Sequence, residues 1–329
     1  MAKQSMRRRL GRSGLEVTAL GLGTWALGGE QFDGSQPDGY AGVDDVEAGK
    51  AVYSAVESGV DFIDTADLYG MGHSERALAP VLRDYPEVLV ATKVGNSFDE
   101  ATKTALGPNL SREYMNREVR ASLDRLGREV IDVYQLHTFS LTDDQIDDIA
   151  GTFEGLVADG LIRWFGISND DPHQLERFAG YEHCTLAQIE LNVLDDNPAA
   201  LAAAEAADLG VVCRSPLAMG LLGGRYDATT RIPPDDIRGK QPEWLKWFTD
   251  GVPDAGYLER LGLVRDLLTR DGRSLAQGAL AWIWARSDRA IPLPGFRDRA
   301  QVADNLGALS QGPLDPATFT QIEQALGRR

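Results

Sequence analysis

Positive charge is scarce in this sequence of 329 residues. Lysine and arginine together number 33, whereas aspartate and glutamate number 50, so the formal net charge is −17. A surface this acidic repels phosphate backbones and anionic lipid headgroups, which argues against a partner that is nucleic acid or membrane. Apolar residues are not scarce: 43% of the chain is hydrophobic, which is ordinary for a globular protein with a large core.

Cysteine and long apolar runs are also scarce. The two cysteines, Cys184 and Cys213, each lie in an apolar, strand-like stretch, so we expect buried free thiols and a cytoplasmic protein. No run of about 18 apolar residues occurs, which argues against a transmembrane helix. The basic start lacks the apolar stretch of a secretory signal peptide, and we expect residues 1–8 to form a flexible leader.

Short apolar runs alternate with longer amphipathic stretches, a pattern typical of parallel strands joined by helices. Eight strands are predicted at Ala19–Thr24, Val60–Asp64, Val88–Lys93, Ile131–His137, Trp164–Ser168, Leu186–Glu190, Val211–Ser215 and Ala290–Pro292. Helices are predicted at Asp45–Ser58, Ser74–Arg83, Arg112–Leu126, Asp143–Asp159, Pro172–Ala179, Pro198–Leu209, Leu275–Ala285 and Arg299–Leu309. This order predicts an α/β fold, the (β/α)8 or TIM barrel, as one domain spanning residues 1–329.

Three additions to the barrel are expected. Arg9–Val17, with two glycines, predicts a short N-terminal hairpin, and Asp315–Leu326 predicts an extra C-terminal helix. Tyr226–Gly256 is predicted to be a long loop after the seventh strand, at the end of the barrel where active sites lie.

One glycine motif could be mistaken for a dinucleotide-binding fingerprint. The stretch Gly21–Ala26 matches the fingerprint with its third glycine relaxed to alanine, and Asp44 and Asp45 follow at a suitable distance. That motif requires a helix to begin at the glycines and hold the pyrophosphate. A polar loop is expected here instead, so we interpret the small residues as a turn over the barrel mouth.

Four polar residues are expected to converge at that mouth. Asp64 ends the second predicted strand and Tyr69 follows it; Lys93 ends the third strand and His137 the fourth. Each alone has an ordinary explanation, such as a surface charge or a buried, satisfied imidazole. Their coincidence at neighbouring strand ends favours a catalytic site.

These four residues suit the reduction of a carbonyl group. A free phenol has a pKa of about 10, and a nearby ammonium lowers it by stabilising the phenolate. In this scheme Tyr69 is the acid that protonates the carbonyl oxygen, and Lys93 tunes it. Asp64 anchors the lysine, and His137 orients the carbonyl.

The sequence resembles the aldo-keto reductase family along nearly its whole length. The motifs that carry the resemblance follow the family's order: Leu10–Val17, Leu20–Trp25, Asp61–Gly70, Gly72–Glu75, Ser122–Gly127, Asp132–His137, Arg163–Asn169, Ser215–Leu222, Ala276–Trp282, Ile291–Gly295, Asp304 and Asn305. The adenine-side motif, with Gly295, is similar to the branch that includes bacterial reductases and potassium-channel β subunits. The resemblance implies an NADPH-dependent reductase of aldehydes and ketones that uses no metal, with Asp64, Tyr69, Lys93 and His137 as its catalytic tetrad.

The resemblance also implies a site for NADP(H). The cofactor-binding positions of the family correspond to Gly23, Thr24, Trp25, Asp64, Ser168, Asn169, Gln188, Arg214, Ser215, Pro216, Leu217, Gly220, Leu222, Gly295, Arg297, Gln301 and Asn305. Among them Arg297 and Gln301 would bind the adenosine 2′-phosphate, unless Arg297 is simply an exposed charge. Arg214 departs from the family, in which an aromatic residue often lies under the nicotinamide. We therefore expect the nicotinamide either to stack on the plane of the Arg214 guanidinium or to have no stacking partner.

The expected partner is a small carbonyl or alcohol substrate, contacted by Trp25, Tyr69, His137, Thr138 and Phe139, with Phe32 a further candidate for the pocket wall. Two other functions remain open. One is a nucleotide-sensing protein that binds NADP(H) but turns over slowly, and the other is a phosphate-substrate isomerase or aldolase that uses Lys93. The substrate, the direction of reaction and the oligomeric state are not readable from the sequence.

Overall fold

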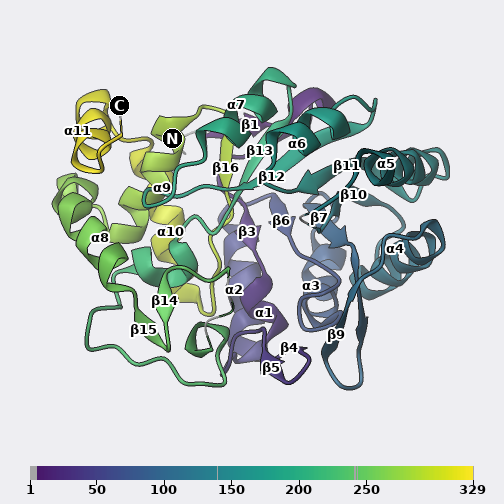
Figure 1. Cartoon of the computed structure of the whole chain (residues 1–329), viewed down its shortest axis with the longest axis horizontal. Helices are drawn as coiled ribbons and strands as arrows, with labels where there is room; N and C mark the ends of the chain where they lie inside the picture. Colours follow the sequence, from purple (N-terminus) through teal and green to yellow (C-terminus); the bar gives the residue numbers. More distant parts are fainter. Residues whose placement is uncertain (1–5, 139, 241, 243, 329) are drawn as a thin grey trace.

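The computed structural model describes residues 6–138, 140–240, 242 and 244–328, and its centre is a sheet of eight parallel strands (Figure 1). In spatial order the strands are β16 (Ala290–Pro292), β13 (Gly210–Arg214), β12 (Cys184–Glu190), β11 (Ile162–Ser168), β10 (Ile131–Leu136), β7 (Leu89–Val94), β6 (Phe62–Asp64) and β3 (Leu22–Gly23). The two edges of the sheet meet, because Gly23 forms a parallel bridge with Gly295 and the Gly21 N–H donates to Pro292 O at 3.1 Å. The predicted (β/α)8 barrel is therefore confirmed.

Helices surround this sheet (Figure 1). They are α2 (Asp45–Glu57), α3 (His73–Asp84), α4 (Arg112–Leu126), α5 (Asp143–Ala158), α6 (Pro172–Phe178), α7 (Pro198–Ala206), α8 (Ala255–Leu268), α9 (Leu275–Arg286), α10 (Arg299–Gln311) and α11 (Pro316–Ala325). Local signals fix their ends: the Ser111 hydroxyl accepts from the Tyr114 N–H at the start of α4, and Gly127, with φ of 64°, ends it. The predicted C-terminal helix corresponds to α11.

The core has two parts. A large cluster fills the space between the strands and the helices, and both Cys184 and Cys213 lie in it as free thiols. A smaller cluster, which includes Phe62, Val133 and Val212, fills the inside of the barrel. The barrel is thus a packed body whose chemistry is confined to its ends.

The N-terminal hairpin contributes to the inner cluster. It consists of β1 (Arg7–Arg9) and β2 (Glu16–Thr18), and Leu10 and Val17 pack inside the barrel with no exposure. The prediction that the leader extends to residue 8 is wrong for its last two residues. Arg7 and Arg8 pair with β2, and Arg7 also forms an ion pair with Asp61 at 2.6 Å.

Several elements differ from the predictions. The loop expected to follow the first strand begins with a one-turn helix, α1 (Trp25–Gly28), and the connection after β7 forms a hairpin of β8 (Asn96–Asp99) and β9 (Thr104–Pro108). Helix α8 was not predicted at all. The Tyr226–Gly256 segment contains regular elements: a 3₁₀ turn at Ile237–Gly239 and a small hairpin of β14 (Phe248–Thr249) and β15 (Val252–Pro253).

Candidate active site

Four of the predicted residues meet at the C-terminal ends of adjacent strands. Asp64 ends β6, Lys93 lies near the end of β7, and His137 directly follows β10. The Lys93 ammonium donates to the Tyr69 hydroxyl at 3.2 Å and forms a very short ion pair with Asp64. The rings of Tyr69 and His137 lie 6.1 Å apart and nearly perpendicular, at 88°. The phenol therefore lies between an ammonium and an imidazole.

The Asp64–Lys93 pair is buried and fully hydrogen-bonded. Their side chains are only 3% and 0% exposed. Asp64 Oδ2 accepts from Gln135 Nε2 at 2.7 Å and from Gln188 Nε2 at 2.8 Å, while Lys93 also donates to Thr65 O at 2.8 Å. A buried ion pair persists only when its other hydrogen-bonding atoms are satisfied, and these partners meet that condition. The ammonium is consequently fixed against the phenol.

The protonation states follow from burial and from this charge arrangement. Burial lowers the pKa of Lys93, but attraction to Asp64 and contact with Tyr69 outweigh it and raise that pKa, so the amine stays charged. Burial raises the pKa of Tyr69, and Lys93 only partly offsets the rise. Burial, together with the positive charges of Lys93 and Arg214, lowers the pKa of His137 to about 3.

The pKa of Tyr69 is shifted upward, whereas we expected the ammonium to lower the phenol pKa below its ordinary value. The reason is that the ring lies in a site where desolvation disfavours the phenolate more than one ammonium stabilises it. Near neutral pH the site thus presents a protonated phenol and a neutral imidazole. A neutral imidazole can orient a carbonyl by hydrogen bonding but is a poor proton source.

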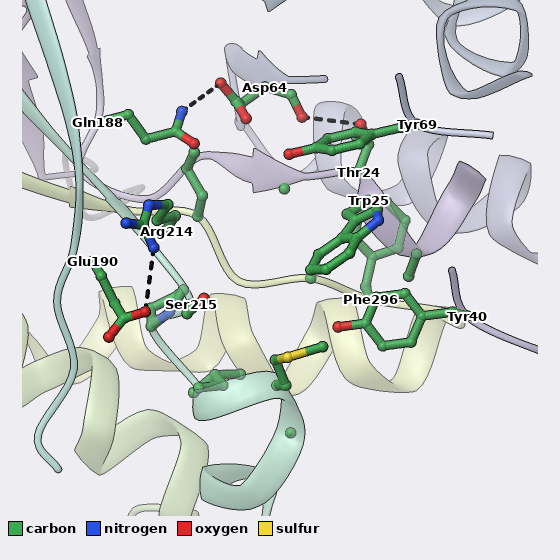
Figure 2. Close-up of a pocket in the computed structure, with 18 of the residues that line it drawn as sticks. Thr24, Trp25, Tyr40, Asp64, Tyr69, Gln188, Glu190, Arg214, Ser215 and Phe296 are labelled. Carbon is green, nitrogen blue, oxygen red and sulfur yellow. Dashed lines mark hydrogen bonds and ion pairs between the residues drawn. The ribbon is translucent and has the colours of Figure 1, made fainter. Parts of the chain in front are cut away.

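Tyr69 and His137 face a cavity of about 1160 Å³, which exceeds the usual range of ligand pockets. Figure 2 shows Trp25, Tyr40 and Phe296 along one side of it and Gln188, Glu190 and Arg214 along the other. The predicted residues that line it are Gly23, Thr24, Trp25, Asp64, Tyr69, His137, Thr138, Gln188, Arg214, Ser215, Pro216, Leu217, Gly220, Gly295, Arg297, Gln301 and Asn305. A single hollow therefore joins the catalytic group to most of the expected cofactor positions.

A few predicted residues lie off this surface. Lys93 is buried behind Tyr69, and the Leu222 side chain is in the core. Phe32 is in β4 (Phe32–Asp33), which pairs with β5 (Gln36–Pro37) and with β9 and does not line the cavity. The prediction for Phe32 is thus wrong. Phe139 lies outside the described residues.

Ser168 and Asn169, two of the predicted cofactor-binding residues, differ in how their polar atoms are satisfied. Ser168 and Asn169, at the end of β11, are 1% and 2% exposed and sit just behind the cavity surface. The Asn169 amide nitrogen already donates to Thr138 O at 3.1 Å and to Gln174 Oε1 at 3.0 Å. The Ser168 hydroxyl, in contrast, is a buried polar atom with no partner among the described residues. Such an atom is expected to gain a partner when a polar ligand binds.

The backbone after β13 adopts a strained conformation. Ser215, Ala218 and Met219 have φ of 52°, 48° and 51°, although none is glycine, and Gly220 follows with φ of 98°. Left-handed conformations at such residues cost about 1–3 kcal/mol each and cluster at ligand sites. A left-handed residue beside a right-handed one can turn neighbouring backbone N–H groups toward an anion. Within this turn the N–H groups of Ala218 and Gly220 already donate to Ser215 O and Leu217 O, both at 2.9 Å.

Arginines lie at the far end of the cavity, where α10 begins. The Arg297 N–H donates to Gln301 Oε1 at 2.7 Å, and its guanidinium donates to Asp236 Oδ2 at 3.0 Å. Asp236 belongs to the Tyr226–Gly256 segment and is also paired with Arg238 at 2.7 Å. This segment therefore lies over the start of α10, with one arginine side chain partly exposed to the cavity.

Arg214 is held by acidic neighbours. It forms an ion pair with Glu190 at 3.2 Å (Figure 2). It also forms a very short ion pair with Asp170, and Lys246 contacts Glu190 as well. The charge of the guanidinium at this wall of the cavity is thus largely balanced.

Sequence reasoning did not name many of the residues that line the cavity, most of which lie in or beside the connections at the barrel mouth. They include Gln31, Asp38, Tyr40, Asn96, Pro108, Leu110, Asp170, Glu190, Met219, Tyr226, Arg238, Trp244, Lys246 and Phe296. The available signal was the unusual length of the connections after the first, third and seventh strands, because long loops at this end of a barrel often form its ligand site.

Comparison with known proteins identifies the family. The model of the Aldo/keto reductase family matches residues 19–326. The chain belongs to this family. It is 29% identical over 290 residues to "Aldo-keto reductase yakc [NADP(+)]" from Schizosaccharomyces pombe, covering 85% of this chain and 82% of that protein. It is also 29% identical over 334 residues to the "NADH-specific methylglyoxal reductase" of Escherichia coli, covering 97% and 98% of the two chains.

Solved structures agree with this aldo-keto reductase assignment. The glycerol dehydrogenase AKR11B4 from Gluconobacter oxydans superposes with a TM-score of 0.82 at 28% identity, covering 99% of this chain and 96% of that one. The holo form of the aldo-keto reductase AKR11C1 from Bacillus halodurans gives a TM-score of 0.76 at 27% identity, covering 98% and 96%. Both matches cover nearly the whole chain.

Two features are absent from the described part of the chain. No helix there is long and apolar enough to cross a membrane. No group of histidine, cysteine, aspartate or glutamate side chains in the same residues is arranged to hold a metal ion.

Proposed function

We propose that this protein is an NADP(H)-dependent reductase of aldehydes or ketones, in which Tyr69 is the general acid. The observation that carries the proposal is the Tyr69 hydroxyl, which faces the cavity while a buried, charged Lys93 donates to it from behind. A phenol held in this way starts protonated, and the adjacent ammonium offsets part of the cost that burial places on its conjugate base, which suits a proton donor to an alkoxide.

The cavity fits a dinucleotide. The unpartnered Ser168 hydroxyl could bind the carboxamide, the left-handed backbone at Ser215–Gly220 could bind the pyrophosphate, and Arg297 could bind the 2′-phosphate. When bound, the cofactor would supply a hydride to the carbonyl carbon. One relative's printed name specifies NADP(+) and another's specifies NADH, so Arg297 is the residue that supports NADP(H) for this chain.

The protein's own part in the reaction is to place and transfer a proton. His137, neutral because its pKa is lowered to about 3, would donate a hydrogen bond from its ring N–H to the carbonyl oxygen and fix its position. Tyr69 would give its proton to that oxygen as negative charge develops there. Lys93 would stabilise the phenolate left behind, and Asp64 would keep Lys93 in place.

Replacing Tyr69 tests the proposal. Tyr69→Phe keeps the ring that stacks on Trp25 at 6.0 Å but removes the acid, so kcat for reduction of a reactive aldehyde with NADPH should fall about 10²- to 10⁴-fold. Binding of NADPH, followed by fluorescence titration, should change little. Tyr40→Phe, which removes another phenol from the same cavity, is the matched control and should retain most of the activity. Full activity in Tyr69→Phe would exclude the phenol as the acid, and tight NADPH binding without any turnover would indicate a nucleotide-binding protein instead.

A further inference from the structure

Tyr69 precedes a turn with an uncommon backbone. Gly70, Met71 and Gly72 have φ of 61°, 53° and 84°, three successive residues in the left-handed region. Such a stretch keeps its conformation only where neighbouring structure holds it. Because Tyr69 is attached directly to it, whatever anchors this turn also sets the position of the phenol.

One anchor comes from the loop after β3. The Gln31 side chain, 2% exposed, accepts a hydrogen bond from the Gly70 N–H at 2.8 Å through Oε1. The backbones also meet, since a Cβ on Gly28 would lie 2.7 Å from the Gly70 nitrogen. Gln31 therefore joins the first loop of the barrel mouth to the residue that follows Tyr69.

Asp38 orients the Gln31 amide. Gln31 Nε2 donates to Asp38 Oδ2 at 2.9 Å, and the Asp38 N–H donates to Gln31 O at 2.8 Å. An amide accepts through one end and donates through the other, so a carboxylate at Nε2 turns Oε1 toward Gly70. Both Gln31 and Asp38 line the cavity that Tyr69 faces.

We propose that Gln31, oriented by Asp38, is a positioning residue for Tyr69, and that protonation of Asp38 weakens this link. The proposal rests on the proposed function for its kinetic test, but the link itself can be tested without catalysis. An ionised carboxylate is a stronger acceptor than a carboxylic acid, so the amide is held most firmly when Asp38 is charged.

The surroundings place this change in an accessible pH range. Burial raises the pKa of Asp38 to about 6, opposed by its hydrogen bond from Gln31 and assisted by the negative charge of Asp33. Other charged residues near this loop include Glu30, which precedes Gln31, and Lys103, whose carbonyl accepts from the Phe32 N–H at 2.8 Å. Asp236, Arg238 and Arg297 lie around Tyr40. Asp38 is thus ionised above about pH 6 and protonated below it. His137 cannot produce a step in the same range, since its pKa is about 3.

The kinetic experiment follows kcat for aldehyde reduction across this pH range in three variants. Wild-type kcat should fall as the pH drops through about 6, and Asp38→Asn, which still offers an acceptor to Gln31 but cannot titrate, should lose that step. Gln31→Met should lower kcat about tenfold at every pH, in line with a misplaced catalytic group, and leave the KM for NADPH nearly unchanged. Asp33→Asn removes the neighbouring exposed carboxylate, and the step should persist. A step retained in Asp38→Asn, or normal kcat in Gln31→Met, would overturn the proposal.

Hydrogen exchange of the cofactor-free protein separates this proposal from the proposed function. The peptide that contains Gly70 should exchange at least severalfold faster in Gln31→Met than in wild type at the same pH, because the N–H loses its acceptor. Unchanged exchange there would refute the link even if the enzyme is active. Faster exchange in a protein that reduces no carbonyl would support the link and refute only the proposed function.

Discussion

Arg297 offers the sharpest test of cofactor choice. Its guanidinium is 31% exposed and lies at the cavity end where α10 begins. NADPH and NADH differ only in the 2′-phosphate, so a residue that binds this group should distinguish the two, and Arg297→Ala should abolish the distinction.

The magnitude follows from the contact that would be lost. A hydrogen bond to a charged group contributes about 1.5–3 kcal/mol, and every 1.4 kcal/mol is about tenfold in affinity. Arg297 is partly exposed and already donates to Asp236 at 3.0 Å. Its bond to the 2′-phosphate should therefore contribute an energy at the lower end of this range, about 1.5 kcal/mol. We therefore expect Arg297→Ala to weaken NADPH binding roughly tenfold and NADH binding by less than about twofold. Asp236 keeps its pair with Arg238 at 2.7 Å, which should preserve the local fold.

The assay is a fluorescence titration of both cofactors at one ionic strength. Arg299→Ala is the matched control, because Arg299 starts the same helix but is 58% exposed and paired with Glu47. Arg299→Ala removes one positive charge from the start of the same helix. It should weaken the binding of NADPH and NADH slightly and equally. Equal losses of NADPH and NADH in Arg297→Ala would refute the assignment, and a tenfold NADPH loss in Arg299→Ala would show that general positive charge is responsible.

Three further predictions concern buried titratable side chains. Burial and two nearby carboxylates raise the pKa of Asp67 well above its ordinary range, so its contribution to stability falls as the pH rises above the unfolded-state pKa of about 4; Asp67→Asn should lose less Tm than wild type on going from about pH 4 to neutral buffer, and a parallel decline would contradict this. Arg125 is bonded to buried Glu75 at 2.6 Å, so Arg125→Met should lower the urea-unfolding free energy by about 3–5 kcal/mol, against less than about 1 kcal/mol for the exposed Arg76→Met. Because the pKa of His137 is lowered to about 3, this residue stays neutral across the assay range, and His137→Gln should lower activity without removing any step in the kcat/KM profile above about pH 5.

The barrel and the four residues at its mouth could be predicted because the information is local. Buried parallel strands read as short apolar runs, and a polar residue at the end of such a run is placed at the mouth by the topology alone. Asp64 and Lys93 follow this rule, and the structure brings them into contact. Their pKa directions could not be predicted in the same way, because the balance at Tyr69 depends on how deeply the ring is buried.

The elements that were missed depend on distant partners. Helix α8 buries only Leu261, Val264 and Leu268, so its apolar stripe is too thin to stand out in the sequence. Gln31 and Asp38 reach the mouth because their loop is tied back by tertiary contacts, such as the bond from the Ile237 N–H to Gly39 O at 2.9 Å. No short-range pattern encodes a contact between segments about 200 residues apart.

The aromatic wall of the cavity also provides an optical probe. The indoles of Trp25, in the first loop region, and Trp244, in the Tyr226–Gly256 segment, lie 6.0 Å apart. Entry of a dinucleotide beneath this segment would change the distance and the environment of the pair, whereas the buried Trp247, Trp282 and Trp284 would be unaffected. Comparing the stopped-flow emission of Trp244→Phe with that of the parent protein would therefore time the arrival of a dinucleotide in the cavity, without a label and without a substrate.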